Sequence, residues 1–345
     1  MNIIFWIATL EILGIVTHLS IFRLFKNFSY VGFCISKPLF LLGFGGVTWI
    51  LHFFAPIEIS KSLILILISI FVIFSYYFNR NYFTSYINSL RSNYLIIFFI
   101  FLTSLTIFGI FLLIKSLDPS ISHTEQPMDF AFLNAVYNSN ANLPSDPWFK
   151  GESINYYYFG YWIFSDITKL SFLNPEISYN LALATIPALL GISIAGLANN
   201  IFTRTNPNFL IGTLAALFSC FLSNTYAIFA WLSENIINSK TFWNYICIEG
   251  LQKSEFSESL VWYPTQFWWW FNSTRIINFF GPNCDTSGSD YTITETPFFS
   301  YLLGDLHPHM MVAPFIISFI TICLLLNKIN ISKITPNSIY ILVAS

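Results

Sequence analysis

The sequence predicts an all-α protein, a polytopic bundle of transmembrane helices whose two long extracytoplasmic segments carry interfacial helices. Three observations support this fold class. Hydrophobic residues make up 55% of the 345 residues and charged residues only 9%, a composition that no water-soluble domain requires. Several apolar stretches approach the roughly 20 residues that a helix needs to cross the hydrocarbon layer. The acidic residues gather in one set of connections between these stretches.

About seven complete spans are predicted, and a truncated eighth follows them. The seven cover residues 2–22, 38–55, 62–78, 93–114, 177–202, 208–232 and 309–327. The apolar run over 338–345 is too short to cross, which indicates a fragment of a longer protein. We predict an N-terminal three-span membrane region over 1–92. The second predicted region is a C-terminally incomplete membrane module over 93–345.

The charges predict which connections lie inside the cell. One set is basic and contains no acid: Arg23, Lys26, Lys37, Arg80, Arg91, Arg204, Lys328 and Lys333. The other set holds 7 Lys and Arg and 16 of the 17 acids. Because short basic loops stay in the cytoplasm, we expect a multi-pass plasma-membrane protein with its N-terminus and both long segments outside. No basic stripe indicates nucleic-acid binding, so the lipid bilayer is the expected partner.

Two features outside the motifs also carry expectations. Glu11 lies within the first span, where a charge is costly, and His18 shares its helix face. We expect the two to face the bundle interior, as packing rather than as a transport site. Cys247 and Cys284 share one outer segment, where a disulfide is chemically allowed. Free cysteines are the alternative.

The first motif, His123–Phe130, supplies the candidate catalytic residues Asp129 and Glu125. Carboxylates beside the fourth span can act as a general base or hold a divalent cation. The alternatives are an N-cap for Asp129 and a solvated loop acid for Glu125. The apolar spacing that follows predicts a short helix over 129–138 that lies on the membrane surface.

The second motif, Pro144–Trp162, is rich in aromatic residues. Its candidate substrate-binding residues are Tyr156, Tyr157, Tyr158 and Trp162. Aromatic rings can stack on sugars, but an interfacial aromatic belt is the more common arrangement. We expect a second interfacial helix over 156–170, because Asp166 and Lys169 make it a poor crossing segment.

The third motif, Trp268–Arg275, adds Trp269 and Arg275 to the candidate substrate-binding residues. A guanidinium presents a planar fork of donors that suits a lipid phosphate. The alternative is an arginine whose stem lies along the membrane and whose head reaches water.

The fourth motif, Thr294–His309, ends in the alternating residues Asp305, His307 and His309. In an extended strand this spacing places all three on one side, as a metal site requires. The alternative is that Asp305 or His307 caps the last span, with Pro308 in its first turn.

Four segments resemble a known family: Thr124–Ala135, Ile154–Gly160, Trp268–Trp270 and Pro297–His309. They are similar to motifs of the uncharacterised prokaryotic membrane proteins named for their triple tyrosine, the YYY family. That family looks related to the C-type glycosyltransferases, which take a sugar from a polyprenyl-phosphate donor on the non-cytoplasmic face. The resemblance implies that the fourth span opens the catalytic module and that Glu125 or Asp129 supplies its acid. The three preceding spans depart from the usual order.

The leading hypothesis is therefore an inverting transfer of a sugar from a polyprenyl-phosphate donor. Asp129, or second Glu125, would deprotonate the acceptor hydroxyl. A divalent cation, Mg²⁺ or Mn²⁺, would neutralise the departing phosphate. A non-enzymatic transporter or lipid-handling protein is one alternative. A hydrolase that uses a metal on Asp305, His307 and His309 is another.

Overall fold

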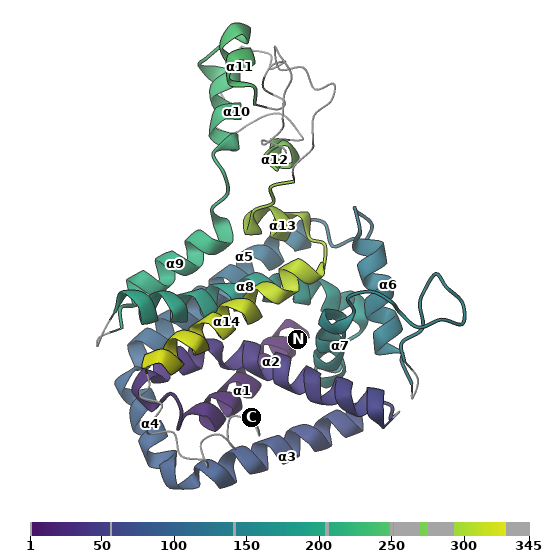
Figure 1. Ribbon diagram of the computed structural model, residues 1–345, viewed down its shortest axis with the longest axis vertical. Coiled ribbons are helices and arrows are strands. Elements are labelled where there is room, and N and C mark those ends of the chain that lie inside the picture. The colour runs from purple at the N-terminus through teal and green to yellow at the C-terminus, as the bar shows by residue number, and fades with distance from the viewer. Residues whose placement is uncertain are drawn as a thin grey trace. The chain divides into compact units, whose positions relative to one another are not determined.

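The computed structural model describes residues 2–55, 57–140, 143–203, 207–248, 251, 269–274 and 293–328. Among these residues there is no β-strand, and a single isolated bridge pairs Ser145 with Ser153. The long apolar runs all form helices (Figure 1). The prediction of an all-α polytopic bundle is confirmed.

The helices of the N-terminal half are α1 (Asn2–Ile21), α2 (Ser29–Phe54), α3 (Lys61–Asn79), α4 (Phe83–Ser92), α5 (Tyr94–Leu117), α6 (Gln126–Tyr137) and α7 (Phe159–Leu170), with 3₁₀ turns at Lys26–Phe28 and Arg80–Tyr82. Those of the C-terminal half are α8 (Pro175–Phe202), α9 (Phe209–Phe221), α10 (Tyr226–Asn235), α11 (Lys240–Ile246), α12 (Trp269–Asn272), α13 (Pro297–Leu303) and α14 (Pro308–Lys328).

Within the described residues, 6 helices are long and apolar enough to cross a membrane, or up to 7 if α9 and α10 together form one span. The sequence predicts one continuous crossing over 208–232, but the helix is interrupted after Phe221. The physical reason is Asn224, whose side-chain oxygen accepts the backbone N–H of Tyr226 at 3.2 Å. Such local bonds compete with helix continuation. The predicted eighth span lies outside the described residues.

The chain divides into two compact units, Met1–Cys220 with Gly304–Ser345, and Phe221–Leu303. In the first unit α8 is the central helix and packs against α2, α5 and α14. Small residues allow these close approaches. A Cβ at Gly191 would lie 2.6 Å from Ile107 of α5, and one at Gly196 would lie 2.7 Å from the Cβ of Cys34 of α2.

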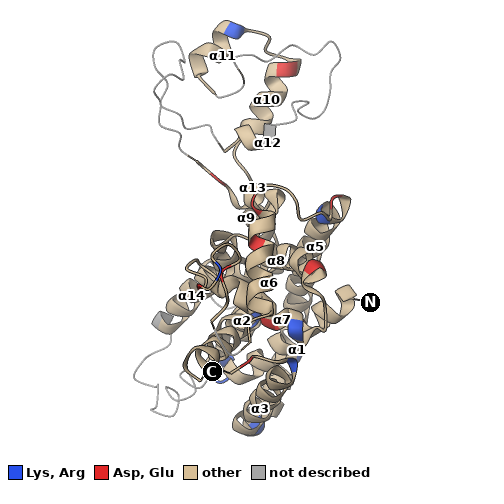
Figure 2. Cartoon of the chain, turned by 90° about the vertical axis from the view of Figure 1, so that its right-hand side faces the viewer, with Lys and Arg blue, Asp and Glu red and all other residues tan. Residues whose placement is uncertain are grey.

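Charged residues are sparse along the long helices (Figure 2). One charge differs from its predicted place: Lys37 is not in a turn but lies inside α2, where its ammonium donates to Glu11 of α1. The Lys37 side chain is only 5% exposed. Gly14 makes room for it, since a Cβ there would lie 2.7 Å from the Lys37 Cγ. The two opposite charges lower the cost of placing each in the membrane.

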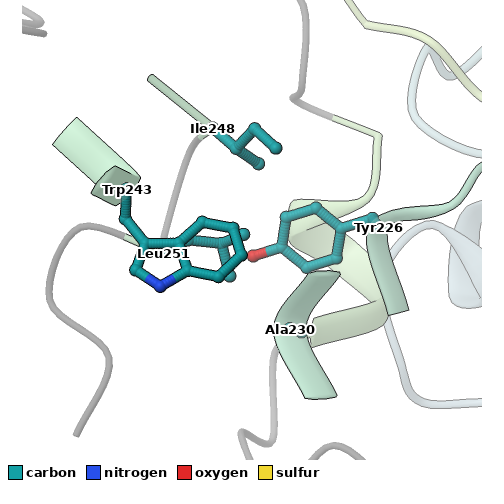
Figure 3. Packing of buried hydrophobic residues seen from close by; sticks show 5 residues of the cluster. All are labelled: Tyr226, Ala230, Trp243, Ile248 and Leu251. Carbon is teal, nitrogen blue, oxygen red and sulfur yellow. The ribbon is translucent and has the colours of Figure 1, made fainter. Parts of the chain in front are cut away.

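The second unit has its own small core. Tyr226, Ala230, Trp243, Ile248 and Leu251 are buried against one another (Figure 3). The Trp243 indole N–H donates to the Ile237 carbonyl at 2.7 Å, which satisfies the one polar atom of that side chain. Cys247 is disulfide-bonded, whereas Cys34, Cys220 and Cys323 are free. The other outer cysteine, Cys284, lies outside the described residues.

The connections that carry the first two motifs gather at one end of the first unit. Lys169 of α7 donates to the Ile59 carbonyl, in the connection after α2, at 2.9 Å. The two predicted short helices exist as α6 and α7, which pack against each other. The second one is enclosed by protein, because every residue of α7 from Tyr161 to Lys169 is buried.

Candidate functional site

The acidic half of the candidate site stands at the beginning of α6. Glu125 directly precedes the helix and Asp129 lies in its first turn. Pro127 fits there because the first turn of a helix has no use for its missing N–H. Asp129 is completely buried and does not act as the N-cap. Its Oδ1 instead accepts the hydroxyl of Tyr161, in α7, at 2.5 Å.

The other half is the turn before α14. Gly304 adopts a φ of 75°, a left-handed conformation that glycine takes without strain, and the chain turns sharply there. The helix begins at Pro308, as the capping alternative predicts. Between the two, Asp305 is buried and His307 is partly exposed.

These two halves, about half the chain apart, meet in space. The Thr124 hydroxyl donates to Asp305 Oδ1 at 2.5 Å. His307 Nε2 lies 2.6 Å from Glu125 Oε2 and 4.0 Å from Asp129 Oδ1. Residues separated by 181 and 182 positions are therefore directly bonded. One imidazole and three carboxyl groups share a single site, which is the arrangement that acid–base chemistry uses.

The carboxyl groups of the site differ in burial, and the pKa values of the two buried ones are raised. Removal from water raises the pKa of Asp129 to about 6, against the opposing effects of the Tyr161 hydroxyl and His307. Among the residues that the structure describes, the second oxygen of Asp129, Oδ2, has no side-chain hydrogen-bond partner, and the Leu306 backbone, like Tyr161 and His307, acts to lower the pKa. Burial also raises the pKa of Asp305, against the Thr124 hydrogen bond. Glu125, with 56% of its side chain exposed, is the carboxyl group of this site that solvent can reach.

An aromatic surface adjoins these carboxyl groups. The Tyr156 ring stacks on Phe132 of α6, with centroids 5.1 Å apart and planes 8° from parallel. Burial raises the pKa of Tyr156, and the charges of Asp129 and Glu125 raise it further. Tyr157 is 75% exposed beside it. The structure therefore places Tyr156 near the acidic residues, and the Tyr157 ring lies against that of Tyr156.

The third tyrosine of the motif points elsewhere. The Tyr158 hydroxyl accepts the indole N–H of Trp49, in α2, at 3.0 Å. Trp162 is buried and donates to Thr48, also in α2, at 3.0 Å. These two residues attach α7 to α2, so their contacts are those of a packing interface.

Three predicted site residues remain: His309, Trp269 and Arg275. His309 stands in the first turn of α14, with its ring centroid 5.6 Å from that of His307. Trp269 begins α12 in the second unit, and Arg275 lies outside the described residues. No three His, Cys, Asp or Glu side chains of the described residues are placed to hold a metal ion. The metal site on Asp305, His307 and His309 stays a prediction.

Sequence reasoning missed Tyr161, which provides the hydrogen bond to Asp129. A signal was present, because Tyr161 lies within the aromatic motif. A buried carboxyl requires a donor, and a nearby motif rich in tyrosine was the place to search for one. Thr124, the partner of Asp305, has a φ of 45°. This backbone conformation is uncommon for a residue other than glycine, and such outliers concentrate at functional sites.

Comparison with known proteins identifies the family. No curated protein and no solved structure matches the chain. One family profile matches residues 44–344, a range that includes α6, α7 and the turn before α14. Because the match extends over most of the chain, this protein belongs to the family described as uncharacterized membrane protein (DUF2298).

Proposed function

We propose that this protein is a membrane glycosyltransferase that moves a sugar from a polyprenyl-phosphate donor to an acceptor at the extracytoplasmic face. The observation that supports the proposal is the meeting of Glu125, Asp129 and His307 at one end of the apolar helices. A lipid-linked donor presents its reacting carbon at the membrane surface, and the ends of the spans are where a protein can reach it.

Glu125 and His307 are the groups best placed to contact substrate. Their side chains are 56% and 20% exposed, whereas that of Asp129 is 0% exposed. In the proposed reaction the exposed pair takes the proton of the acceptor hydroxyl. The acceptor oxygen bonds to the anomeric carbon of the sugar, and the bond from that carbon to the phosphate oxygen breaks with inversion. Asp129, 4.0 Å from the same Nε2, acts as a buried charge that helps to hold the imidazole in place.

The sugar and the phosphate require different surroundings. The exposed face of Tyr156 beside Glu125 offers a platform for a sugar ring. Lys115 at the end of α5 donates to the Gln126 side chain at 3.5 Å and is the cation near Asp305. Three carboxyl groups repel a phosphate, so a divalent cation is proposed to balance the leaving group. Loss of transfer on chelation, and its recovery with Mg²⁺ or Mn²⁺, tests that part.

The charge distribution supports the extracytoplasmic placement. Arg91 precedes α5 and Lys328 ends α14, so both lie at the opposite ends of these helices from Glu125 and His307. Basic residues mark the cytoplasmic side. The disulfide at Cys247 agrees with an oxidising compartment for the second unit.

A donor-turnover assay tests the proposal. Membranes that contain the protein are incubated with polyprenyl phosphate bearing a radiolabelled hexose, and release of label from the lipid fraction is measured. Glu125→Gln should lower turnover by about 10² to 10⁴. The matched control is Asp118→Asn, an exposed acid of the same segment that bonds His123, and it should retain turnover. No turnover by the wild type, or full turnover by Glu125→Gln, would overturn the proposal.

Transport is the second candidate, because one observation favours it. Glu11 and Lys37 line a small pocket in the middle of the first unit, together with the hydroxyls of Ser104 and Thr185. Polar groups at mid-membrane mark ion and substrate pathways. Substrate flux into proteoliposomes without turnover of a sugar lipid would support transport. The metal-dependent hydrolase remains a third candidate, which metal analysis of the purified protein tests.

A further inference from the structure

A further buried carboxyl, outside the candidate site, lies on the side of α7 that faces α2. Asp166 is 2% exposed, and its Oδ2 lies 2.5 Å from the hydroxyl of Thr48. The mechanism proposed above does not use this group. Its surroundings nevertheless define its protonation state.

The Thr48 hydroxyl has three partners but only one proton. It lies 3.0 Å from the Gly45 carbonyl, 2.5 Å from Asp166 Oδ2 and 3.0 Å from the indole Nε1 of Trp162. A carbonyl only accepts and an indole N–H only donates. When the Thr48 hydroxyl donates its proton to the Gly45 carbonyl, it can only accept from Trp162 and from Asp166. The contact with Asp166 is then a hydrogen bond only if the carboxyl carries a proton to donate.

The charged groups around Asp166 are engaged with other partners. Lys169, one turn later on α7, donates to the Ile59 carbonyl at 2.9 Å and lies over the Tyr137 ring of α6. On α2, His52 bonds the Ile57 carbonyl and the Ser139 hydroxyl. Glu58 and Lys61, from the connection and the start of α3, act on Lys169. Removal from water, against Thr48 and Lys169, raises the pKa of Asp166 to about 7.

The same helix carries the residue that holds the candidate catalytic acid. Trp162 and Asp166 bond α7 to Thr48 of α2, and Tyr161, adjacent to Trp162, donates to Asp129. Any displacement of α7 from α2 therefore moves the Tyr161 hydroxyl away from Asp129.

We propose that Asp166 is a positioning residue that holds a proton, joins α7 to α2 through Thr48, and so keeps Tyr161 bonded to Asp129. The inference does not depend on which reaction the site performs. The proton on Asp166 thus contributes to the position of the Tyr161 hydroxyl beside Asp129. Raising the pH ionises Asp166 and weakens the contact between α7 and α2.

Infrared spectroscopy of the purified protein in detergent micelles tests the proton. At pH 6 the wild type should show the carbonyl band of a protonated carboxyl that Asp166→Asn lacks, and this band should disappear as the pH rises through about 7. The asparagine amide can donate to Thr48 in place of the carboxyl. The unfolded state loses this proton near pH 4 and the folded state near pH 7, so the variant should melt at the wild-type temperature below pH 4 and increasingly above it as the pH rises from 4 to 7. Identical spectra at pH 6 would overturn the protonated state.

A matched pair of variants tests the positioning role. Thr48→Val removes the hydroxyl and Thr48→Ser keeps it. Because the Tyr161 hydrogen bond lowers the pKa of Asp129, loosening α7 should move the infrared titration of Asp129 to higher pH in the valine variant. The serine variant should titrate like the wild type. An unchanged Asp129 titration in a folded valine variant would refute the positioning role. If that variant does not fold, the Asp129 titration of Asp166→Leu, which cannot bond Thr48, is compared with that of Asp166→Asn, which can.

Discussion

The ion pair between Glu11 and Lys37 gives a quantitative prediction for the stability of the first unit. The Lys37 side chain is 5% exposed and that of Glu11 is 23% exposed, so neither charge can reach water easily. Removing one partner of a buried pair costs about 3–5 kcal/mol. A buried lysine without a partner can become neutral by losing its proton, which costs about 4.6 kcal/mol at pH 7. A buried glutamate without a partner can become neutral by gaining a proton, which costs about 3.7 kcal/mol.

These values rank the variants. Glu11→Gln leaves the more buried cation alone and should lower the free energy of unfolding by about 4–5 kcal/mol. Lys37→Met leaves the more exposed and more easily neutralised acid, and about 3–4 kcal/mol should be lost. The double variant Glu11→Gln with Lys37→Met has no charge to bury, so it should equal or exceed the wild type.

Unfolding titrations with SDS in mixed micelles measure all four proteins. The informative quantity is the coupling between the two positions, which the four free energies of unfolding define. A double variant as unstable as Glu11→Gln alone would refute the reasoning. It would mean that the stems of the two side chains, rather than their opposite charges, stabilise the contact between α1 and α2.

Two further predictions concern the site. A Cβ at Gly160 would lie 2.4 Å from Cε and 2.6 Å from Sδ of Met311. Gly160→Val should therefore lower the free energy of unfolding by about 1–3 kcal/mol. Adding Met311→Ala should recover most of this loss, and no recovery would mean that the strain lies elsewhere. Because burial raises the pKa of Asp129 from 3.8 to about 6, the folded state holds a proton that the unfolded state has lost. Its contribution, about 3 kcal/mol, is present below pH 4 and disappears as the pH rises to 6. Thermal melting of Asp129→Asn should lack this part of the pH dependence, and an unchanged profile would contradict it.

Much of the fold follows from apolar runs of sufficient length. The helices over 2–21, 94–117 and 175–202 end within three residues of their predicted bounds, because the length of a span is fixed by the bilayer. The prediction that Lys37 lies in a connection was wrong, because a lysine normally marks the end of an apolar segment. Its helical position depends on Glu11 and Gly14 from another helix, and such tertiary compensation is not visible in local sequence.

The carboxyl groups and the imidazole of the site could be predicted from the sequence, but their burial could not. Motif composition indicated Glu125, Asp129, Asp305 and His307, and the structure brings these four together. Composition does not indicate which carboxyl is buried. The packing of α7 against α6 makes that choice, since it covers Asp129 and leaves Glu125 exposed. Sequence reasoning favoured Asp129 as the base, whereas the structure makes Glu125 the accessible one.

The distance along the chain between Glu125 and His307 has a consequence for biosynthesis. They are 182 residues apart, and a ribosome that adds about 5–20 residues per second needs roughly 10–40 seconds to cover that interval. Throughout that time Glu125 and Asp129 have been made but Asp305 and His307 have not. The four-residue site therefore cannot form until the turn before α14 has been translated.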